Sequence, residues 1–167
     1  MENLQLVSGL ERPEEIGALF TEYTRMLVDC DSRFQQYLDI QQYDEEVRHL
    51  EKKYGPPAGR LYLALCNGEA AGCAALRPLD GERCELKRLY VRPAFRGRGL
   101  GRLLTEQILR DAREIGYACV LLDTMPCLTA ARRMYRELGF YEIPCYNDSP
   151  LDDTVFLQLD LTETTEK

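Results

Sequence analysis

Apolar side chains recur at helical spacing in the first third of the chain. The clearest run follows Arg12-Pro13, because a proline in the first turn with acidic neighbours favours a helix start. Its apolar positions share one face, which we expect to be buried: Ile16, Leu19, Phe20, Tyr23, Met26 and Leu27. Shorter patterns predict a second helix around Phe34–Leu38 and a third over Asp44–Tyr54, and Gly55–Gly59 is typical of a loop.

Patterns typical of β-strands dominate the rest of the chain. Asn67-Gly68 is the strongest hairpin signal, and it joins two apolar runs. We expect strands at residues 1–8, 61–66, 69–76, 84–91, 117–123, 140–146 and 154–161, with helices over 99–116 and 126–139. This order predicts one α/β (α+β) domain over residues 1–161, with a mixed, mostly antiparallel sheet of six to seven strands flanked by helices on both faces. Residues 162–167 form a polar C-terminal tail.

Composition and charge narrow the classes of partner. The net charge of −7 argues against general affinity for nucleic acid or anionic membranes. No apolar run reaches membrane-spanning length, and the N-terminus has no signal-peptide pattern. The 7 cysteines stand singly without C-x-x-C spacing, so we expect reduced thiols and a cytoplasmic protein. With His49 as the sole histidine, zinc spacing is absent and we expect no metal.

A glycine-rich turn lies between a predicted strand and a predicted helix. Its sequence is Arg96-Gly97-Arg98-Gly99-Leu100-Gly101-Arg102. Unpaired N–H groups and the helix dipole make such a turn an anion site, and glycines let a ligand approach the backbone. We interpret it as a pyrophosphate cradle. A tight basic turn, or a phosphate site for another nucleotide or an RNA, is the alternative that the turn alone leaves open.

Two segments together resemble one known family. Arg96-x-x-Gly99-x-Gly101 follows Leu89-Tyr90-Val91, and Ala131-x-x-x-Tyr135-x-x-Leu138-Gly139-Phe140 comes later in the chain. The pair resembles the acyl-CoA motif and the last helix of the GNAT acyltransferase superfamily, and the likeness covers residues 84–146. The resemblance implies an N-acetyltransferase with acetyl-CoA as cosubstrate. The acetyl group would pass directly to a primary amine of a small molecule, amino acid or protein, without a covalent enzyme intermediate. A non-catalytic acyl-CoA sensor or regulatory module is the alternative.

The resemblance also implies roles for individual residues. Main-chain groups of Leu89 and Val91 would hold the pantetheine arm, and N–H groups of the glycine turn would hold the pyrophosphate. The implied cofactor-binding set is Leu89, Tyr90, Val91, Arg96, Gly97, Arg98, Gly99, Leu100, Gly101 and Arg102. Many members of the superfamily carry an asparagine at the position of Leu128, so that contact is lost here or replaced by Thr124 or Thr129.

Two residues are implied in catalysis and three in acceptor binding. Tyr135 would protonate the leaving thiolate, since a phenol is protonated at neutral pH. Glu85 would act as the base for the amine or, alternatively, orient a cationic acceptor. Tyr37, Arg77 and Tyr146 are candidates for the acceptor pocket. We expect acetyl-CoA and an amine as partners, and a monomer or a homodimer.

Overall fold

The protein is described by a computed structural model that covers residues 2–36, 43–149 and 151–161. Within these residues, seven strands form one sheet in the order β1-β2-β3-β4-β5-β7-β6. The strands are β1 (Leu4–Ser8), β2 (Arg60–Cys66), β3 (Glu69–Pro78), β4 (Arg83–Val91), β5 (Cys119–Thr124), β6 (Tyr141–Ile143) and β7 (Val155–Asp160). The helices are α1 (Pro13–Cys30), α3 (Tyr43–Arg48), α4 (Leu50–Tyr54), α5 (Leu100–Ile115) and α6 (Thr129–Leu138), with short 3-10 turns at Gly9–Glu11 and Pro93–Phe95.

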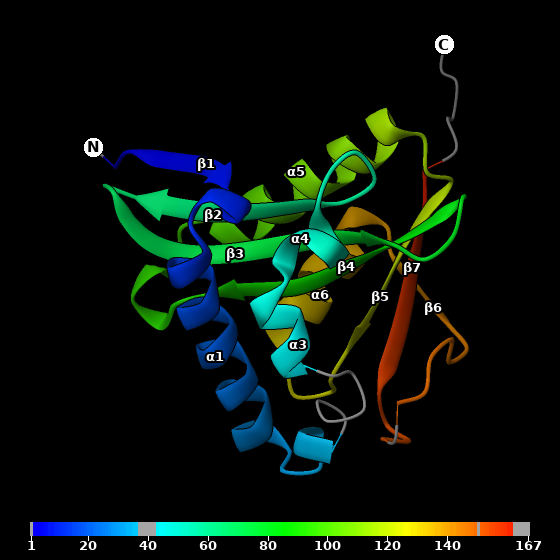
Figure 1. The fold of residues 1–167 in the computed structure, drawn as a ribbon. Helices are drawn as coiled ribbons and strands as arrows, with labels where there is room; N and C mark the ends of the chain where they lie inside the picture. Colours follow the sequence, from blue (N-terminus) through cyan, green and yellow to red (C-terminus); the bar gives the residue numbers. More distant parts are fainter. Residues whose placement is uncertain (1, 37–42, 150, 162–167) are drawn as a thin grey trace.

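Helices cover both faces of the sheet, as the sequence predicts. α1, α3 and α4 lie on one face, and α5 and α6 lie on the other (Figure 1). The predicted apolar face of α1 is buried through Ile16, Leu19 and Phe20. On the opposite face, Leu104 and Ile108 of α5 are fully buried against the sheet. The expected α/β sheet flanked on both faces is therefore confirmed.

The sheet opens between its two central strands. β4 and β5 run parallel, but they pair only from Arg83↔Cys119 to Glu85↔Leu121. Beyond Glu85 the two strands diverge (Figure 1). The strand β4 also carries a register shift against β3, and Arg88 adopts a positive φ of 59°. This part of the sheet therefore combines an open edge with an irregular strand, and the site described below lies there.

Some boundaries differ from the sequence prediction. α6 begins at Thr129 rather than at Pro126, because Leu128 N–H bonds to the Met125 carbonyl in a turn that precedes the helix. The predicted helix over Asp44–Tyr54 divides at His49 into α3 and α4. β6 ends at Ile143, directly before Pro144, which cannot donate to a strand ladder. The predicted tail and Tyr37 lie outside the described residues.

One disulfide corrects the expectation of reduced thiols. Cys30, at the end of α1, is joined to Cys127 in the segment before α6, 97 positions later in the sequence. The positions of the cysteines in the sequence do not predict this pair, because the two segments come together only in the folded chain. The prediction of a cytoplasmic protein rested on cysteines that are all reduced, and the disulfide removes that support. Among the described residues, no helix has both the length and the apolar character needed to cross a bilayer.

Candidate functional site

The glycine turn presents main-chain donors at the start of α5. Gly97 and Gly99 adopt φ values of 81° and 80°, which lie in the left-handed region that glycine tolerates best. Among the described residues, no acceptor bonds the N–H groups of Gly97, Arg98 and Gly99. Gly99 is also the N-cap of α5 and supplies no side-chain cap. These donors and the positive end of the helix dipole form a site for an anion.

A groove of about 420 Å³ runs from this turn along the edge of β4 to α6. We call it the large groove. Eight of the ten residues implied in cofactor binding line it: Leu89, Tyr90, Val91, Arg96, Gly97, Gly99, Leu100 and Gly101. The side chains of the other two lie elsewhere, since Arg98 pairs with Glu2 and Arg102 pairs with Glu137. Their positive charges are therefore partly neutralised.

The edge of β4 directs main-chain groups into the large groove. Arg92 N–H donates to the Ala71 carbonyl on β3 at 2.8 Å. Because residues of an antiparallel strand alternate in direction, the main-chain groups of Val91 and Leu89 point away from β3, towards the gap beside β5. Arg96 Nε donates to the Val91 carbonyl at 2.9 Å. The remaining edge groups can pair with an extended, amide-bearing ligand.

A narrow cavity of about 40 Å³ lies where β4 and β5 separate. Tyr23, Leu89 and Leu128 line both this narrow cavity and the large groove, so the two are adjacent. Lys87, Arg88, Asp123 and Tyr135 bring polar groups to its wall. The arrangement allows a ligand in the large groove to present one end to these groups. Leu128 lies at the junction of the two spaces and offers an apolar contact there in place of an amide.

Tyr135 supplies a protonated phenol to the narrow cavity. Its ring packs against Phe140 with 5.5 Å between ring centroids, and the side chain is buried. Burial, together with the nearby Tyr23 and Asp123, raises the pKa of Tyr135 well above its usual value. Burial likewise raises the pKa of Tyr23 to about 12. Both phenols therefore keep their protons throughout the neutral range.

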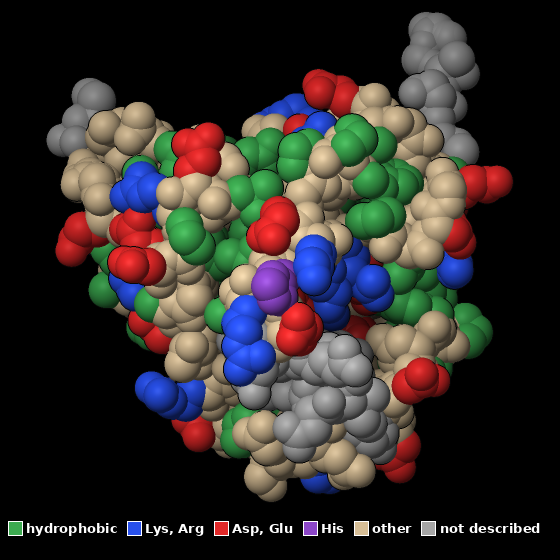
Figure 2. All heavy atoms as spheres, viewed as in Figure 1, with side chains coloured by type: hydrophobic (Ala, Val, Ile, Leu, Met, Phe, Trp, Pro, Cys, Tyr) green, Lys and Arg blue, Asp and Glu red, His purple; other side chains and the backbone are tan. Residues whose placement is uncertain are grey.

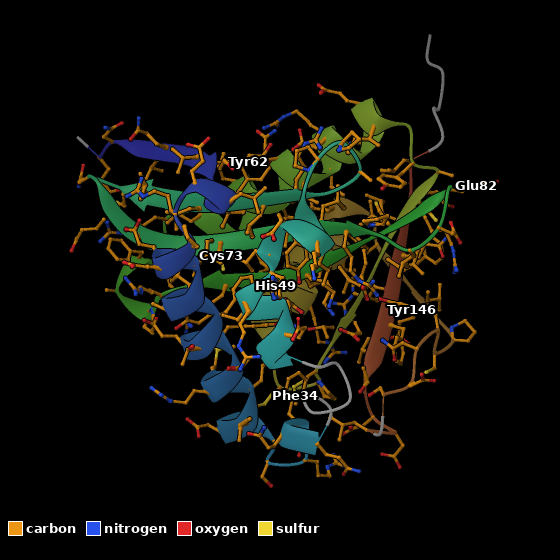
Figure 3. The ribbon with its side chains drawn as sticks, viewed as in Figure 1. Phe34, His49, Tyr62, Cys73, Glu82 and Tyr146 are labelled. Carbon is orange, nitrogen blue, oxygen red and sulfur yellow. A yellow bond between two sulfur atoms is a disulfide. The ribbon has the colours of Figure 1, made fainter. Side chains whose placement is uncertain are left out.

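Glu85 is held by two of the predicted acceptor-site residues. Its carboxylate accepts hydrogen bonds from Arg77 Nε at 2.7 Å and from the Tyr146 hydroxyl at 2.6 Å. Tyr146 lies beside β7 (Figure 3). Burial alone would raise the pKa of Glu85, but the charges of Lys87 and Arg77 and these hydrogen bonds hold it below the usual value. Glu85 is thus a buried carboxylate that stays ionised, and among the described residues it does not line the narrow cavity.

A second buried carboxylate organises the helices above the sheet. Glu46 of α3 accepts from Arg88 through Nε and Nη2, both at 2.8 Å, from Lys53 Nζ at 2.8 Å, and from the Tyr54 hydroxyl. Burial opposes the charge of Glu46, yet Arg88 and Lys53 hold its pKa well below the usual value. Figure 2 shows Lys and Arg side chains gathered beside His49 on this face. The network fixes α3 and α4 to β4.

Lys87 contrasts with its neighbours. Its side chain is buried and lines the narrow cavity. It makes no hydrogen bond or ion pair with any residue in the described part of the chain. Burial lowers the pKa of Lys87 to about 8, with Glu85 and Asp123 opposing the shift and Arg88 and Lys53 adding to it. At neutral pH it is therefore still mainly a cation.

Sequence reasoning missed Tyr23, Glu46, Lys87 and Asp123 as site residues. Tyr23 and Glu46 belong to helices that sequence patterns predict, but those patterns do not show which part of the sheet each helix crosses. Lys87 lies in the predicted strand before the glycine turn, where the alternation of side chains assigns a residue to one face of the sheet and says no more about its role. Tyr37 is outside the described residues, so its proposed role stays a prediction. In the part of the chain that is described, no three His, Cys, Asp or Glu side chains cluster as metal ligands do.

Comparisons with known proteins agree with this architecture. A family model described as the acetyltransferase (GNAT) family matches residues 20–140. An uncharacterized N-acetyltransferase of Schizosaccharomyces pombe is 33% identical over 94% of this chain and 95% of its own length. An acetyltransferase from Streptococcus agalactiae shares the fold with a TM-score of 0.73 at 22% identity, covering 94% of this chain and 98% of its own. An acetyltransferase from Salmonella typhimurium, solved with its cofactor acetyl-CoA, has a TM-score of 0.63 at 22% identity. The match covers 99% of this chain and 96% of that one.

Proposed function

Because the chain belongs to the acetyltransferase (GNAT) family and is an acetyl-CoA-dependent acyltransferase, we propose that it transfers the acetyl group to a primary amine without a covalent enzyme intermediate. The observation that carries this proposal is the adjacency of the large groove to the narrow cavity that contains Tyr135. The first space fits a long, anionic cofactor, and the second offers a proton donor at its end. The acidic net charge of −7 favours a small or protein amine over nucleic acid or an anionic membrane as the acceptor.

The large groove would hold acetyl-CoA by its two ends. The pyrophosphate accepts hydrogen bonds from the N–H groups of Gly97 to Gly101 at the positive end of α5. The amides of the pantetheine arm pair with the open edge of β4, where the main-chain groups of Leu89 and Val91 point into the gap. Arg96 holds the Val91 carbonyl and would release it as the arm binds. The thioester then reaches the junction formed by Tyr23, Leu89 and Leu128.

The reaction at this junction needs two proton movements. The neutral amine nitrogen attacks the thioester carbonyl, the new C–N bond forms and the C–S bond breaks. The leaving thiolate takes a proton from the Tyr135 hydroxyl, which is protonated throughout the neutral range because its pKa is raised. The ammonium proton of the intermediate passes to the tyrosinate, directly or through solvent, which restores the phenol. The products are the N-acetylated amine and free CoA.

Glu85 fits the orienting role better than the role of base. A base for an amine works best with a pKa near neutrality, whereas Arg77 and Tyr146 hold Glu85 ionised with a lowered pKa. Its fixed negative charge instead favours a cationic amine nearby and positions Tyr146. We therefore assign Glu85, Arg77 and Tyr146 to one positioning group beside the acceptor.

The test is a turnover screen with product identification. The purified chain is incubated with acetyl-CoA and separate panels of simple amines, amino acids, polyamines and aminoglycosides. Free thiol is measured continuously, and mass spectrometry identifies the acetylated product. We expect thiol release and amine acetylation to be equal for at least one panel. Thiol release without an acetylated amine would contradict the proposal. Stabilisation by CoA without any turnover would also contradict it and would favour the acyl-CoA sensor.

A further inference from the structure

We propose that the acceptor is an amino carboxylic acid whose carboxylate binds the ammonium group of Lys87. The inference rests on the proposed function and adds the chemical class of the acceptor to it. It starts from a single property of Lys87: this side chain brings a positive charge to the wall of the narrow cavity, and no described residue pairs with it.

A buried ammonium without a partner is costly. Lysine is almost never fully buried unless it is paired, and removing its charge from water costs several kcal/mol before compensation. Lys87 is 8% exposed, in contrast to the exposed Lys52 of α4. A fold built for stability alone would place an apolar side chain at this position. The retained cation therefore indicates an anionic ligand group.

The neighbouring anions are already committed to other partners. Glu46 accepts from Arg88, Lys53 and Tyr54. Glu85 accepts from Arg77 and Tyr146.

Asp123 accepts from Asn147 Nδ2 at 2.8 Å. None of these three carboxylates comes within ion-pair distance of Lys87. The local field of Glu85 and Asp123 favours the charged form of Lys87, yet no carboxylate of the described chain meets it. The direct partner must therefore arrive with the substrate.

The dimensions of the site limit the acceptor. Lys87 and Tyr135 line the same narrow cavity of about 40 Å³, which is room for a few small polar groups. The amine must lie near Tyr135, where the thioester ends, and the carboxylate must reach Lys87 in the same small space. A carboxylate and an amine separated by a few bonds satisfy both conditions. A polyamine would instead bring a second cation towards Lys87 and Arg88, which is unfavourable.

The experiment compares matched acceptors that differ in one charge. Each amino acid is paired with its primary amide, which has nearly the same shape and retains the amine but lacks the negative charge. We measure kcat and KM for both members with wild type, Lys87→Met, Lys87→Arg and Lys52→Met. Lys52→Met removes an exposed lysine of α4 that does not line the narrow cavity and is the control. Comparing the ratio of kcat/KM values between variants cancels the intrinsic difference in amine reactivity.

We expect wild type to prefer the amino acid. Lys87→Met should lower the selectivity ratio by about 10-fold or more, because it removes a charge-assisted interaction, and the change should appear in KM for the amino acid. Lys87→Arg should keep part of the selectivity, and Lys52→Met should keep all of it. Thermal unfolding and acetyl-CoA binding verify that each variant is folded.

Two results would overturn the inference. One is an unchanged selectivity ratio in Lys87→Met, and the other is a wild-type enzyme that acetylates amides as well as amino acids. Either result leaves the proposed amine acetylation intact. A wild-type enzyme that acetylates no amine in any panel would instead refute the proposed function, and the inference about Lys87 with it.

Discussion

Lys87 and Arg88 are consecutive in the chain, yet both side chains lie on the same face of the sheet. Lys87 is opposite Ala75, which belongs to the core beneath α1 and α4. Arg88 reaches Glu46 of α3 and lies 5.9 Å from the ring centroid of Phe20 in α1. Regular alternation would place them on opposite faces. The positive φ of Arg88 and the register shift against β3 remove that alternation and bring two cations to the open part of the sheet.

The first prediction concerns the cost of burying Lys87. Lys87→Met should stabilise the protein at pH 7 by about 2 to 3 kcal/mol, because the folded state loses an unpaired buried charge. The pKa of Lys87 is about 8 in the folded protein, compared with its ordinary value of 10.5 in the unfolded chain. Between these values the unfolded chain binds the proton and the folded one does not, so wild type gains stability as pH rises.

The stability advantage of Lys87→Met should therefore shrink between pH 8 and pH 10.5. The charged groups that face Lys87 and shift its pKa are Glu85, Arg88, Asp123 and Lys53. Denaturant unfolding of both proteins across this range measures the difference. Lys52→Met should change stability by less than about 0.5 kcal/mol. A less stable Lys87→Met protein at pH 7 would mean that the ammonium has a stabilising partner.

The second prediction tests the pyrophosphate cradle. Gly99→Asp should weaken acetyl-CoA binding by about 10-fold or more, since it places a negative charge at the proposed pyrophosphate site and a side chain at a φ of 80°. Gly116→Asp is the matched control, because it carries the same charge and strain at a φ of 109° at the opposite end of α5. Calorimetry of both variants measures the affinities. Equal affinity in the two variants would place the diphosphate elsewhere.

The third prediction concerns the proton donor. Tyr135→Phe should lower kcat by about 100-fold, because it removes the proposed general acid, with little change in acetyl-CoA affinity. The raised pKa of Tyr135 also means that its ionisation produces no loss of rate below pH 10 in wild type. Tyr117→Phe is a suitable control, since Tyr117 donates to the Ala58 carbonyl far from the groove. Undiminished turnover in Tyr135→Phe would assign the proton to another group, and Tyr23, which lines the same narrow cavity, would be the next candidate.

The fourth prediction separates the two roles of Glu85. If it orients the acceptor, Glu85→Gln should raise KM for the amine and should not remove a rising limb from the pH–rate profile near neutrality. The reason is that Lys87, Arg77 and Tyr146 hold its pKa below the usual value, so Glu85 does not titrate in that range. Steady-state kinetics from pH 5 to pH 9 provide the test. Loss of a rising limb near neutrality would instead identify Glu85 as the base.

The fifth prediction concerns the link between α1 and the large groove. Cys30→Ser should destabilise the oxidised protein by about 2 to 4 kcal/mol, because a bond across 97 residues restricts the unfolded chain. The reductant dithiothreitol should produce the same loss in wild type and no further loss in Cys30→Ser. Cys145→Ser removes an exposed free thiol and serves as the control. Equal melting temperatures with and without reductant would show that the two cysteines are not bonded in solution.

Much of the fold follows from the sequence because its signals are local. The apolar periods of α1 and α5 and the Asn67-Gly68 turn each specify their own element. The glycine turn was likewise predictable, because closely spaced glycines between a strand and a helix leave main-chain N–H groups free to bind an anion. The pairing of Glu46 with Arg88, 42 residues later, was not, because it depends on how α3 crosses the sheet. The role of Lys87 depends on the irregularity at Arg88, which the residue types around it do not signal.

The hydrogen bond from Arg96 to the Val91 carbonyl has a consequence for solubility. A strand whose polar groups face no neighbour is a template on which other chains can add, and proteins commonly guard such strands with charge. Here the exposed backbone lies inside the sheet, where β5 turns away, and Arg96 both occupies one acceptor and places a cation at the opening. The same arginine can thus keep foreign strands out of the seam until the proper ligand displaces it.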